Sequence, residues 1–317
     1  MESLAALLDD GLRFDPRYPP DLNSDHLPMA LCAIDGLGGG MADLLAFREG
    51  YLPQLREFQA QPPALDWRVE LGSDDRYPAV LALLLTRIAQ QGVDRILGES
   101  LPLLLPGMAA EAFHPLIRLG YSLAFQVPRE SAAALAYMIC TNVNVPCDPE
   151  RQIDLAAALQ AQVGCPAPAP GGRFGAGLLA LLEQGDYPQG RADSLRTCAR
   201  LSLDIYRSTR NFFALHMVTA THAARVCAAF VPERLMLASL TGALMAAHRI
   251  IKAPAFEQPN RVAAPGTLDA AHALKYVYTC QAEYGAWGDE RYLEEIDLFR
   301  RAGLVPAWAG QVSPSRA

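Results

Sequence analysis

Lysine is nearly absent from this chain of 317 residues. Lys252 and Lys275 are the only two, so almost all of the 27 Lys and Arg residues are arginines, and 34 Asp and Glu residues leave a net charge of -7. Proteins that bind nucleic acid or acidic membranes gather their cations on one face. Here the arginines are scattered among acidic residues, which argues against both partners.

Signals for export and membrane insertion are also missing. The first residues, MESLAALLDDGLRFD, carry acids where a signal peptide would not. The longest apolar stretches, residues 212–230 and 234–247, contain His, Arg or Glu at intervals too short for a membrane span. Seven cysteines without a Cys-x-x-Cys pair indicate neither a disulfide framework nor a thiolate metal site. We therefore expect a cytoplasmic protein.

Alternating β-branched runs, which are typical of strands, are few. Ala- and Leu-rich segments with apolar residues three and four apart run nearly end to end. This pattern predicts an all-α multi-helix bundle, one domain over residues 1–317, with two helical halves packed around a central metal and substrate pocket. The segment CPAPAPGGRFG, residues 165–175, is the clearest internal break. The predicted helices cover residues 25–36, 40–58, 76–91, 93–105, 114–126, 129–142, 150–163, 173–184, 193–209, 211–229, 233–251, 267–285 and 290–302.

Six histidines lie mostly on apolar helical faces. Histidine is the commonest neutral nitrogen ligand for iron and zinc, so several buried ones suggest a metal site. His26 and His114 each lie at the start of a predicted helix, where a capping or core role explains them at least as well as ligation does. His248 lies at a helix end beside Arg249 and Lys252, which favours a structural role.

One predicted helix carries two histidines, His216 and His222. Six residues apart, they point in different directions and are not expected to bind one ion. The segments THAAR (221–225) and AHALK (271–275) both place a basic residue three after a histidine. This short similarity favours His222 as the ligand and leaves His216 for contact with substrate.

His272 and Lys275 lie three apart and share one helical face. A buried lysine has a lowered pKa, and its neutral amine can add carbon dioxide to become a carbamate, an anionic oxygen ligand. Arginine cannot react in this way. On the pattern alone, a structural Lys275 that reaches solvent or pairs with Asp269 or Glu283 is the favoured alternative.

Four segments in order carry a resemblance to a known family: SDHLPMAL (24–31), FHPLIRLGY (113–121), HMVTATHAAR (216–225) and AHALKY (271–276). Together they resemble the questin oxidase-like family, which includes oxygenases that cleave anthraquinone rings. The resemblance implies a mononuclear non-heme iron held by histidines and a carboxylated lysine. The implied ligands are His26, His114, His222 (with His216 as the alternative), His272 and Lys275.

We therefore predict a non-heme Fe(II)-dependent oxygenase that uses dioxygen for oxidative, Baeyer-Villiger-like ring cleavage of an aromatic polyketide or quinone-like substrate. His216 or Arg118 is expected to orient the substrate oxygen or stabilise its charge, and Tyr121 and Tyr276 to line the pocket or donate a proton. The resemblance also implies NADPH as an external reductant, because the sequence encodes no nucleotide-binding fold.

Two other functions stay open. A metal-free helical ligand-binding protein would use the histidines as ordinary core residues. A zinc-dependent hydrolase would keep the same ligands without consuming oxygen. The sequence leaves open whether the chain forms a homo-oligomer.

Overall fold

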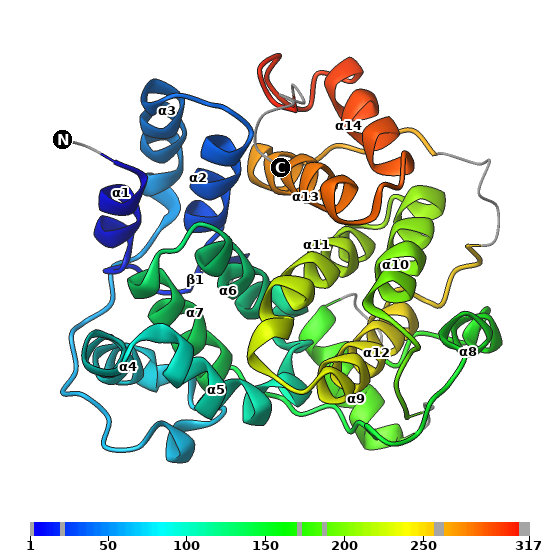
Figure 1. Cartoon of the computed structure of the whole chain (residues 1–317), viewed down its shortest axis with the longest axis horizontal. Coiled ribbons are helices and arrows are strands. Elements are labelled where there is room, and N and C mark those ends of the chain that lie inside the picture. The colour runs from blue at the N-terminus through cyan, green and yellow to red at the C-terminus, as the bar shows by residue number, and fades with distance from the viewer. Residues whose placement is uncertain (1–2, 20–22, 170–172, 186–188, 257–262, 311–317) are drawn as a thin grey trace.

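Helices make up most of the computed structural model, which describes residues 3–19, 23–169, 173–185, 189–256 and 263–310. The prediction of an all-α bundle is confirmed for this part of the chain (Figure 1). Its α-helices are α1 (Leu4–Gly11), α2 (Leu27–Gly36), α3 (Met41–Tyr51), α4 (Tyr77–Gln91), α5 (Val93–Leu104), α6 (His114–Ala124), α7 (Pro128–Cys140), α8 (Leu155–Gln162), α9 (Phe174–Gln184), α10 (Leu195–Thr209), α11 (Phe212–Cys227), α12 (Glu233–Ile250), α13 (Ala270–Trp287) and α14 (Arg291–Arg301).

Every predicted helix has a counterpart, and the main differences lie at helix ends. The predicted helix 40–58 ends at Tyr51, and a 3-10 turn follows at Leu52–Gln54, because Pro53 disfavours continuation of the helix. Helix α8 begins only at Leu155, where the Asp154 side chain caps it by accepting a hydrogen bond from the Ala157 amide. The short helix α1 was not predicted. The expected break at 165–175 lies partly outside the described residues.

One short ribbon interrupts the helical pattern. Strands β1 (Arg17–Tyr18) and β2 (Asn23–Ser24) pair antiparallel, with Arg17 opposite Ser24 and Tyr18 opposite Asn23. Chain segments on either side of the ribbon lead into α1 and α2. The ribbon therefore fixes the position of Tyr18 relative to the start of α2.

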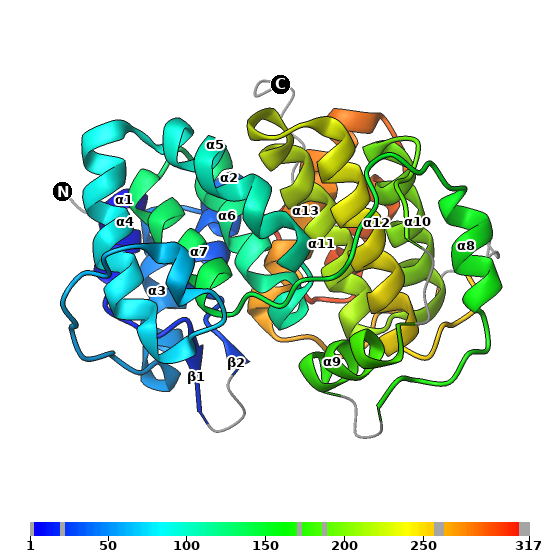
Figure 2. The same ribbon diagram turned by 90° about the horizontal axis from the view of Figure 1, so that it is seen from below.

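Four helices form a closed ring at the middle of the molecule. Helix α2 packs against α6, α6 against α11, α11 against α13, and α13 against α2. Figures 1 and 2 show the first seven helices of the chain on one side and the later helices on the other, with α2 and α6 of the ring on the first side and α11 and α13 on the second. Among the described helices, none combines the length and unbroken apolarity that a membrane crossing requires.

The tightest crossing in the central ring joins α6 and α11. A Cβ atom added to Gly120 would lie 2.6 Å from the Cα atom of Ala223, closer than real Cβ contacts. Only glycine therefore lets the two helix backbones approach this closely. The crossing holds the N-terminal turns of α6 and α11 side by side.

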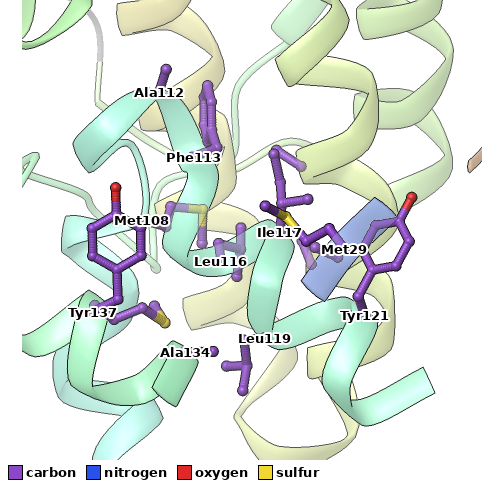
Figure 3. Close-up of a cluster of buried hydrophobic side chains, with 14 of the residues drawn as sticks. Met29, Met108, Ala112, Phe113, Leu116, Ile117, Leu119, Tyr121, Ala134 and Tyr137 are labelled. Atoms are coloured by element: carbon purple, nitrogen blue, oxygen red, sulfur yellow. The ribbon is translucent and has the colours of Figure 1, made fainter. Parts of the chain in front are cut away.

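The core around α6 is made of fully buried aliphatic side chains. Leu116, Ile117 and Leu119 of α6 and Met29 of α2 are each at most 1% exposed, and Figure 3 shows them together beside α7. Burying each such side chain contributes about 1.5–3 kcal/mol. Packing on this scale fixes the helices of the ring relative to one another.

Replacement of Gly120 by alanine tests the close crossing. We expect Gly120→Ala to lower the free energy of unfolding by about 1–3 kcal/mol, because the new methyl group meets the α11 backbone. The matched control is Gly98→Ala in the exposed interior of α5, where a Cβ meets nothing within 4 Å. There the change should raise the free energy of unfolding by about 0.5–1 kcal/mol. Urea denaturation measures both, and equal effects would contradict the packing.

Candidate metal centre

Each helix of the central ring brings one histidine to the same point. His26 is the N-cap of α2, His114 is the first residue of α6, His272 is the third residue of α13, and His216 is the fifth residue of α11. One ligand atom from each lies within 4.8 Å of the others, and all four residues are buried. The Nε2 atom of His114 is 2.8 Å from that of His26 and 3.1 Å from that of His216. We call these residues the four-histidine cluster.

The outer nitrogen of each imidazole ring has its own partner. The Nδ1 atom of His114 contacts the Glu111 carbonyl, and that of His216 lies 2.9 Å from the Phe212 carbonyl. In His272, Nδ1 lies 2.7 Å from Oδ2 of Asp269. Carbonyl and carboxylate oxygens only accept hydrogen bonds, so these three Nδ1 atoms carry the proton.

His26 differs in having a hydroxyl partner. Its Nδ1 atom lies 3.3 Å from the hydroxyl oxygen of Tyr51. A hydroxyl can donate or accept, so this contact alone does not fix the tautomer. The Nε2 atom of His26 nevertheless points into the cluster, as those of its neighbours do.

Because their protons face outward, His114, His216 and His272 direct the lone pairs of their Nε2 atoms into the cluster. Burial lowers the pKa of His26, His114 and His216 well below the ordinary value and that of His272 to about 4, and nearby cationic groups add to the effect. Neutral imidazoles are therefore favoured. Converging lone pairs repel unless a cation lies between them, and outward Nδ1–H bonds are the usual companions of metal-binding histidines. The cluster thus fits a metal ion.

Lys275 lies one helical turn after His272 and is only 1% exposed. Its ammonium nitrogen and the Nε2 atom of His272 are buried without a hydrogen-bond partner among the described residues. Burial lowers the pKa of Lys275 to about 7. An unpaired amine that is half neutral at physiological pH is unusual for a purely structural lysine.

A strained turn places His114. Glu111, Ala112 and Phe113 have φ angles of 51°, 52° and 69°, the left-handed region that non-glycine residues rarely enter. Each such residue costs about 1–2 kcal/mol. The turn is held by the contact of Glu111 with Arg17 and by the packing of Phe113 on Phe174. The turn directs the Glu111 carbonyl at Nδ1 of His114, so the strained backbone fixes the orientation of the His114 ring.

A cavity of about 1120 Å³ opens onto the cluster through His26, His114 and His272. Aromatic rings from three helices line it: Phe47 of α3, Phe174 of α9, and Phe212 and Phe213 of α11. Its polar and other aromatic lining residues include Arg17, Tyr18, Asn23, Ser24, Tyr51, Gln54 and Glu111. A large, mainly aromatic cavity with a few polar groups is typical of a small-molecule site.

The structure places His216, not His222, in the four-histidine cluster. The Nδ1 atom of His222 lies 2.9 Å from a carboxylate oxygen of Glu283, and its ring packs against Tyr121 and Tyr278. Six residues along a helix leave two side chains pointing about 120° apart, at 3.6 residues per turn. The similarity between residues 221–225 and 271–275, which favoured His222 as the ligand, was misleading. The cluster contains His216, the residue expected only as the alternative, and it does not contain His222.

Three residues expected to contact substrate lie away from the cavity. Arg118 forms a buried ion pair with Glu130 of α7. Tyr121 donates its hydroxyl hydrogen bond to the Lys275 carbonyl at 2.9 Å, and Tyr276 donates to Glu295 at 3.0 Å. None of the three lines the cavity. Their polar groups hold helices together, so the expected catalytic roles are corrected to structural ones.

Other residues also surround the cluster. Asp269, named from the sequence only as a partner for Lys275, caps α13 through the His272 amide and also holds the His272 ring. The acid-x-x-His spacing, which Glu111 and His114 share, is the local signal of such contacts. Tyr51, from the end of α3, has no such signal, because it reaches the cluster only through the tertiary fold.

The fold and site define a helical protein with a buried four-histidine centre beneath an aromatic cavity. The family model for questin oxidase-like proteins matches residues 23–186, just over half of the chain. The chain therefore belongs to the questin oxidase-like family. The matched residues include His26 and His114, whereas His216, His272 and Lys275 lie beyond them. No curated protein matches the chain by sequence.

Relief of the strained turn gives a stability test. We expect Ala112→Gly to raise the free energy of unfolding by about 1 kcal/mol, since glycine enters the left-handed region without the Cβ clash. Ala112 lines the cavity but is also buried in the core, so loss of its methyl packing offsets part of this gain. The control, Ala157→Gly at an exposed position of α8, should lower it by about 0.5–1 kcal/mol. Chemical denaturation that finds Ala112→Gly equally destabilising would contradict the left-handed turn.

Proposed function

We propose that this protein is a non-heme iron oxygenase that acts on quinone-like aromatic substrates, with His26, His114, His216, His272 and a carboxylated Lys275 as the iron ligands. The observation that carries the proposal is the convergence of imidazole lone pairs whose protons are held outward by the Glu111 and Phe212 carbonyls and the Asp269 carboxylate. Membership of the questin oxidase-like family supports an oxidase-type reaction.

The choice of iron rests on the reaction more than on the ligands. Imidazole suits iron and zinc alike, so the four-histidine cluster accommodates either. Zinc has no redox chemistry and would serve only a hydrolase. Bound Fe(II) would supply the binding and activation of dioxygen. The second candidate, zinc-dependent hydrolysis, keeps the same ligands and predicts no oxygen consumption.

Lys275 is proposed to complete the ligand set as a carbamate. Its neutral amine forms a nitrogen–carbon bond with carbon dioxide and releases one proton to solvent, which leaves an anionic carboxylate on the side chain. Burial favours this step, because the buried amine is readily neutral near pH 7. The resulting negative charge would offset part of the charge of the metal ion.

The cavity is proposed to hold the substrate rings. Its volume of about 1120 Å³ slightly exceeds the range of about 300–1,000 Å³ for ligand pockets, so it has room for several fused rings. The four phenylalanine rings exclude water and provide faces for stacking. In Baeyer-Villiger-like cleavage one oxygen atom of dioxygen enters the ring beside a carbonyl. The other becomes water with two electrons from an external reductant such as NADPH.

The proposed ligand set predicts which histidine the metal requires. We expect His216→Ala to lose iron affinity by more than the roughly 10–100-fold that loss of an outer-shell partner costs. The same change at His222 on the same helix should leave iron content near that of the wild type. Metal analysis after anaerobic loading with Fe(II) measures both. Equal iron in the two variants would sink the proposed site, and zinc without oxygen uptake in the wild type would favour the hydrolase.

Carboxylation of Lys275 predicts a dependence on carbon dioxide and pH. The amine reacts only when neutral, so carbamate formation and iron retention in bicarbonate should increase as the pH rises through about 7. The histidines are already neutral there and add little to this change. Labelled bicarbonate should give a carbamate carbon signal in the NMR spectrum that Lys275→Met lacks. The matched control is Lys252→Met, at the other lysine, which is exposed and should keep the signal.

A further inference from the structure

We propose that Tyr18 is a catalytic hydrogen-bond donor to an oxygen atom of the bound substrate, and that Tyr51 is a positioning residue that holds Tyr18 in this donating state. The proposal rests on the proposed function for the presence of a quinone-like substrate. Both tyrosines line the cavity, both are 9% exposed, and neither was predicted from the sequence.

The hydroxyl group of Tyr51 meets three polar groups. It lies 3.0 Å from the backbone nitrogen of His26, 3.3 Å from Nδ1 of His26 and 3.4 Å from the hydroxyl oxygen of Tyr18. A backbone N–H can only donate, so Tyr51 accepts the first bond. With Nε2 of His26 bound to a metal ion, as the proposed function requires, its Nδ1 atom carries the proton and donates the second bond.

These two bonds fix where the Tyr51 proton goes. A phenol oxygen has one proton to donate and two acceptor positions, and His26 takes both acceptor positions. The Tyr51 proton is therefore directed to the remaining neighbour, the oxygen atom of Tyr18. This oxygen accepts, so Tyr18 must donate its own proton elsewhere.

The Tyr18 hydroxyl has no second partner among the described residues, and it lies at the cavity wall. Its proton is thus available to a molecule in the cavity. Burial raises the pKa of Tyr18, which keeps the hydroxyl protonated at neutral pH. The order of donation therefore runs from His26 to Tyr51, then to Tyr18, and from Tyr18 into the cavity.

Packing holds both rings in this arrangement. Tyr51 stacks on Phe47 with ring centres 5.7 Å apart and planes at 19°, and it meets the Tyr18 ring edge-on at 6.3 Å. The ribbon pairs Tyr18 with Asn23 just before the segment that leads to His26. Few rotamers are open to a ring held in this way, so the donor is positioned before the substrate arrives.

The chemistry of the donor indicates what it recognises. A quinone carbonyl or phenolate oxygen accepts a hydrogen bond, and a bond to an anionic oxygen is stronger than one to a neutral oxygen. Any negative charge that builds on this oxygen during the reaction would strengthen the contact. Tyr18 is therefore expected to distinguish ring systems that carry an oxygen atom at this position from those that do not.

Two soluble probes with the same ring skeleton test the proposal. Anthraquinone-2-sulfonate and anthracene-2-sulfonate differ only in the two quinone oxygens. Calorimetry under anaerobic conditions should show that Tyr18→Phe weakens binding of the quinone probe by about 10-fold, the effect of losing a typical hydrogen bond. Binding of the anthracene probe should not change. The control is Tyr77→Phe, whose buried hydroxyl has no partner and lies outside the cavity.

A second pair of variants separates positioning from direct contact. Tyr51→Phe should weaken binding of the quinone probe because Tyr18 is no longer held as a donor. Adding Tyr18→Phe to this variant should therefore cause little further loss of affinity. Tyr51→Phe should also reduce iron retention, because Nδ1–H of His26 loses the hydroxyl oxygen that accepts its hydrogen bond. In contrast, Tyr18→Phe alone should keep the iron content of the wild type.

Each outcome decides a specific point. Unchanged quinone binding in Tyr18→Phe, or equal weakening of both probes, overturns the donor role whatever the iron content. Quinone binding that depends on Tyr18 in a wild-type protein that retains no iron supports the donor and rejects the iron oxygenase. A wild-type protein that binds neither probe overturns the donor role for quinone-like rings.

Discussion

The outward hydrogen bonds of the cluster histidines are the constraint on which the rest of the site depends. Each ring has two nitrogens, and fixing the proton on one determines what the other can do. The Phe212 carbonyl lies on the same helix as its histidine, the Glu111 carbonyl lies in the turn before α6, and the Asp269 carboxylate caps α13. Local structure thus orients three of the four candidate ligands, and only His26 depends on a partner from another helix, Tyr51 of α3.

The central ring then brings the prepared ligands together. The close approach of Gly120 to Ala223 sets the spacing of α6 and α11, and the contacts of α13 with α2 and α11 close the ring. Aliphatic side chains of α6 and α2 fill the space beside it. The positions of the histidines are therefore a result of helix packing. Replacement of Gly120 by a larger residue would push α6 and α11 apart and change the spacing of His114 and His216.

Much of the helical pattern could be predicted from the sequence, because apolar spacing and Pro–Gly breaks act over a few residues. For His26, His114 and Lys275 the local signals fitted structural roles at least as well, and the family resemblance named them with His272 as candidate ligands. The structure brings the three histidines together. The local signals failed to choose between His216 and His222, because the choice depends on which face of α11 meets the ring.

The roles expected for Arg118, Tyr121 and Tyr276 failed for a related reason. These residues were chosen because they lie close to the predicted ligands in the sequence. Their actual partners, Glu130, the Lys275 carbonyl and Glu295, belong to other helices and could not be predicted from that closeness. Tyr18 and Tyr51 were missed because a ribbon and the end of α3 meet only in the folded chain.

Three of the four cluster histidines, His26, His114 and His272, lie at the N-cap or in the first turn of their helices, and this shared position has an electrostatic consequence. The N-terminus of a helix carries a partial positive charge, which falls off within the first turn. Three such ends meet at one group of imidazoles that are favoured as neutral. Their partial charges favour anionic groups at this place. A carbamate on Lys275 and a phenolate oxygen of the substrate would both lower the energy of a place that the backbone itself has made electron-poor.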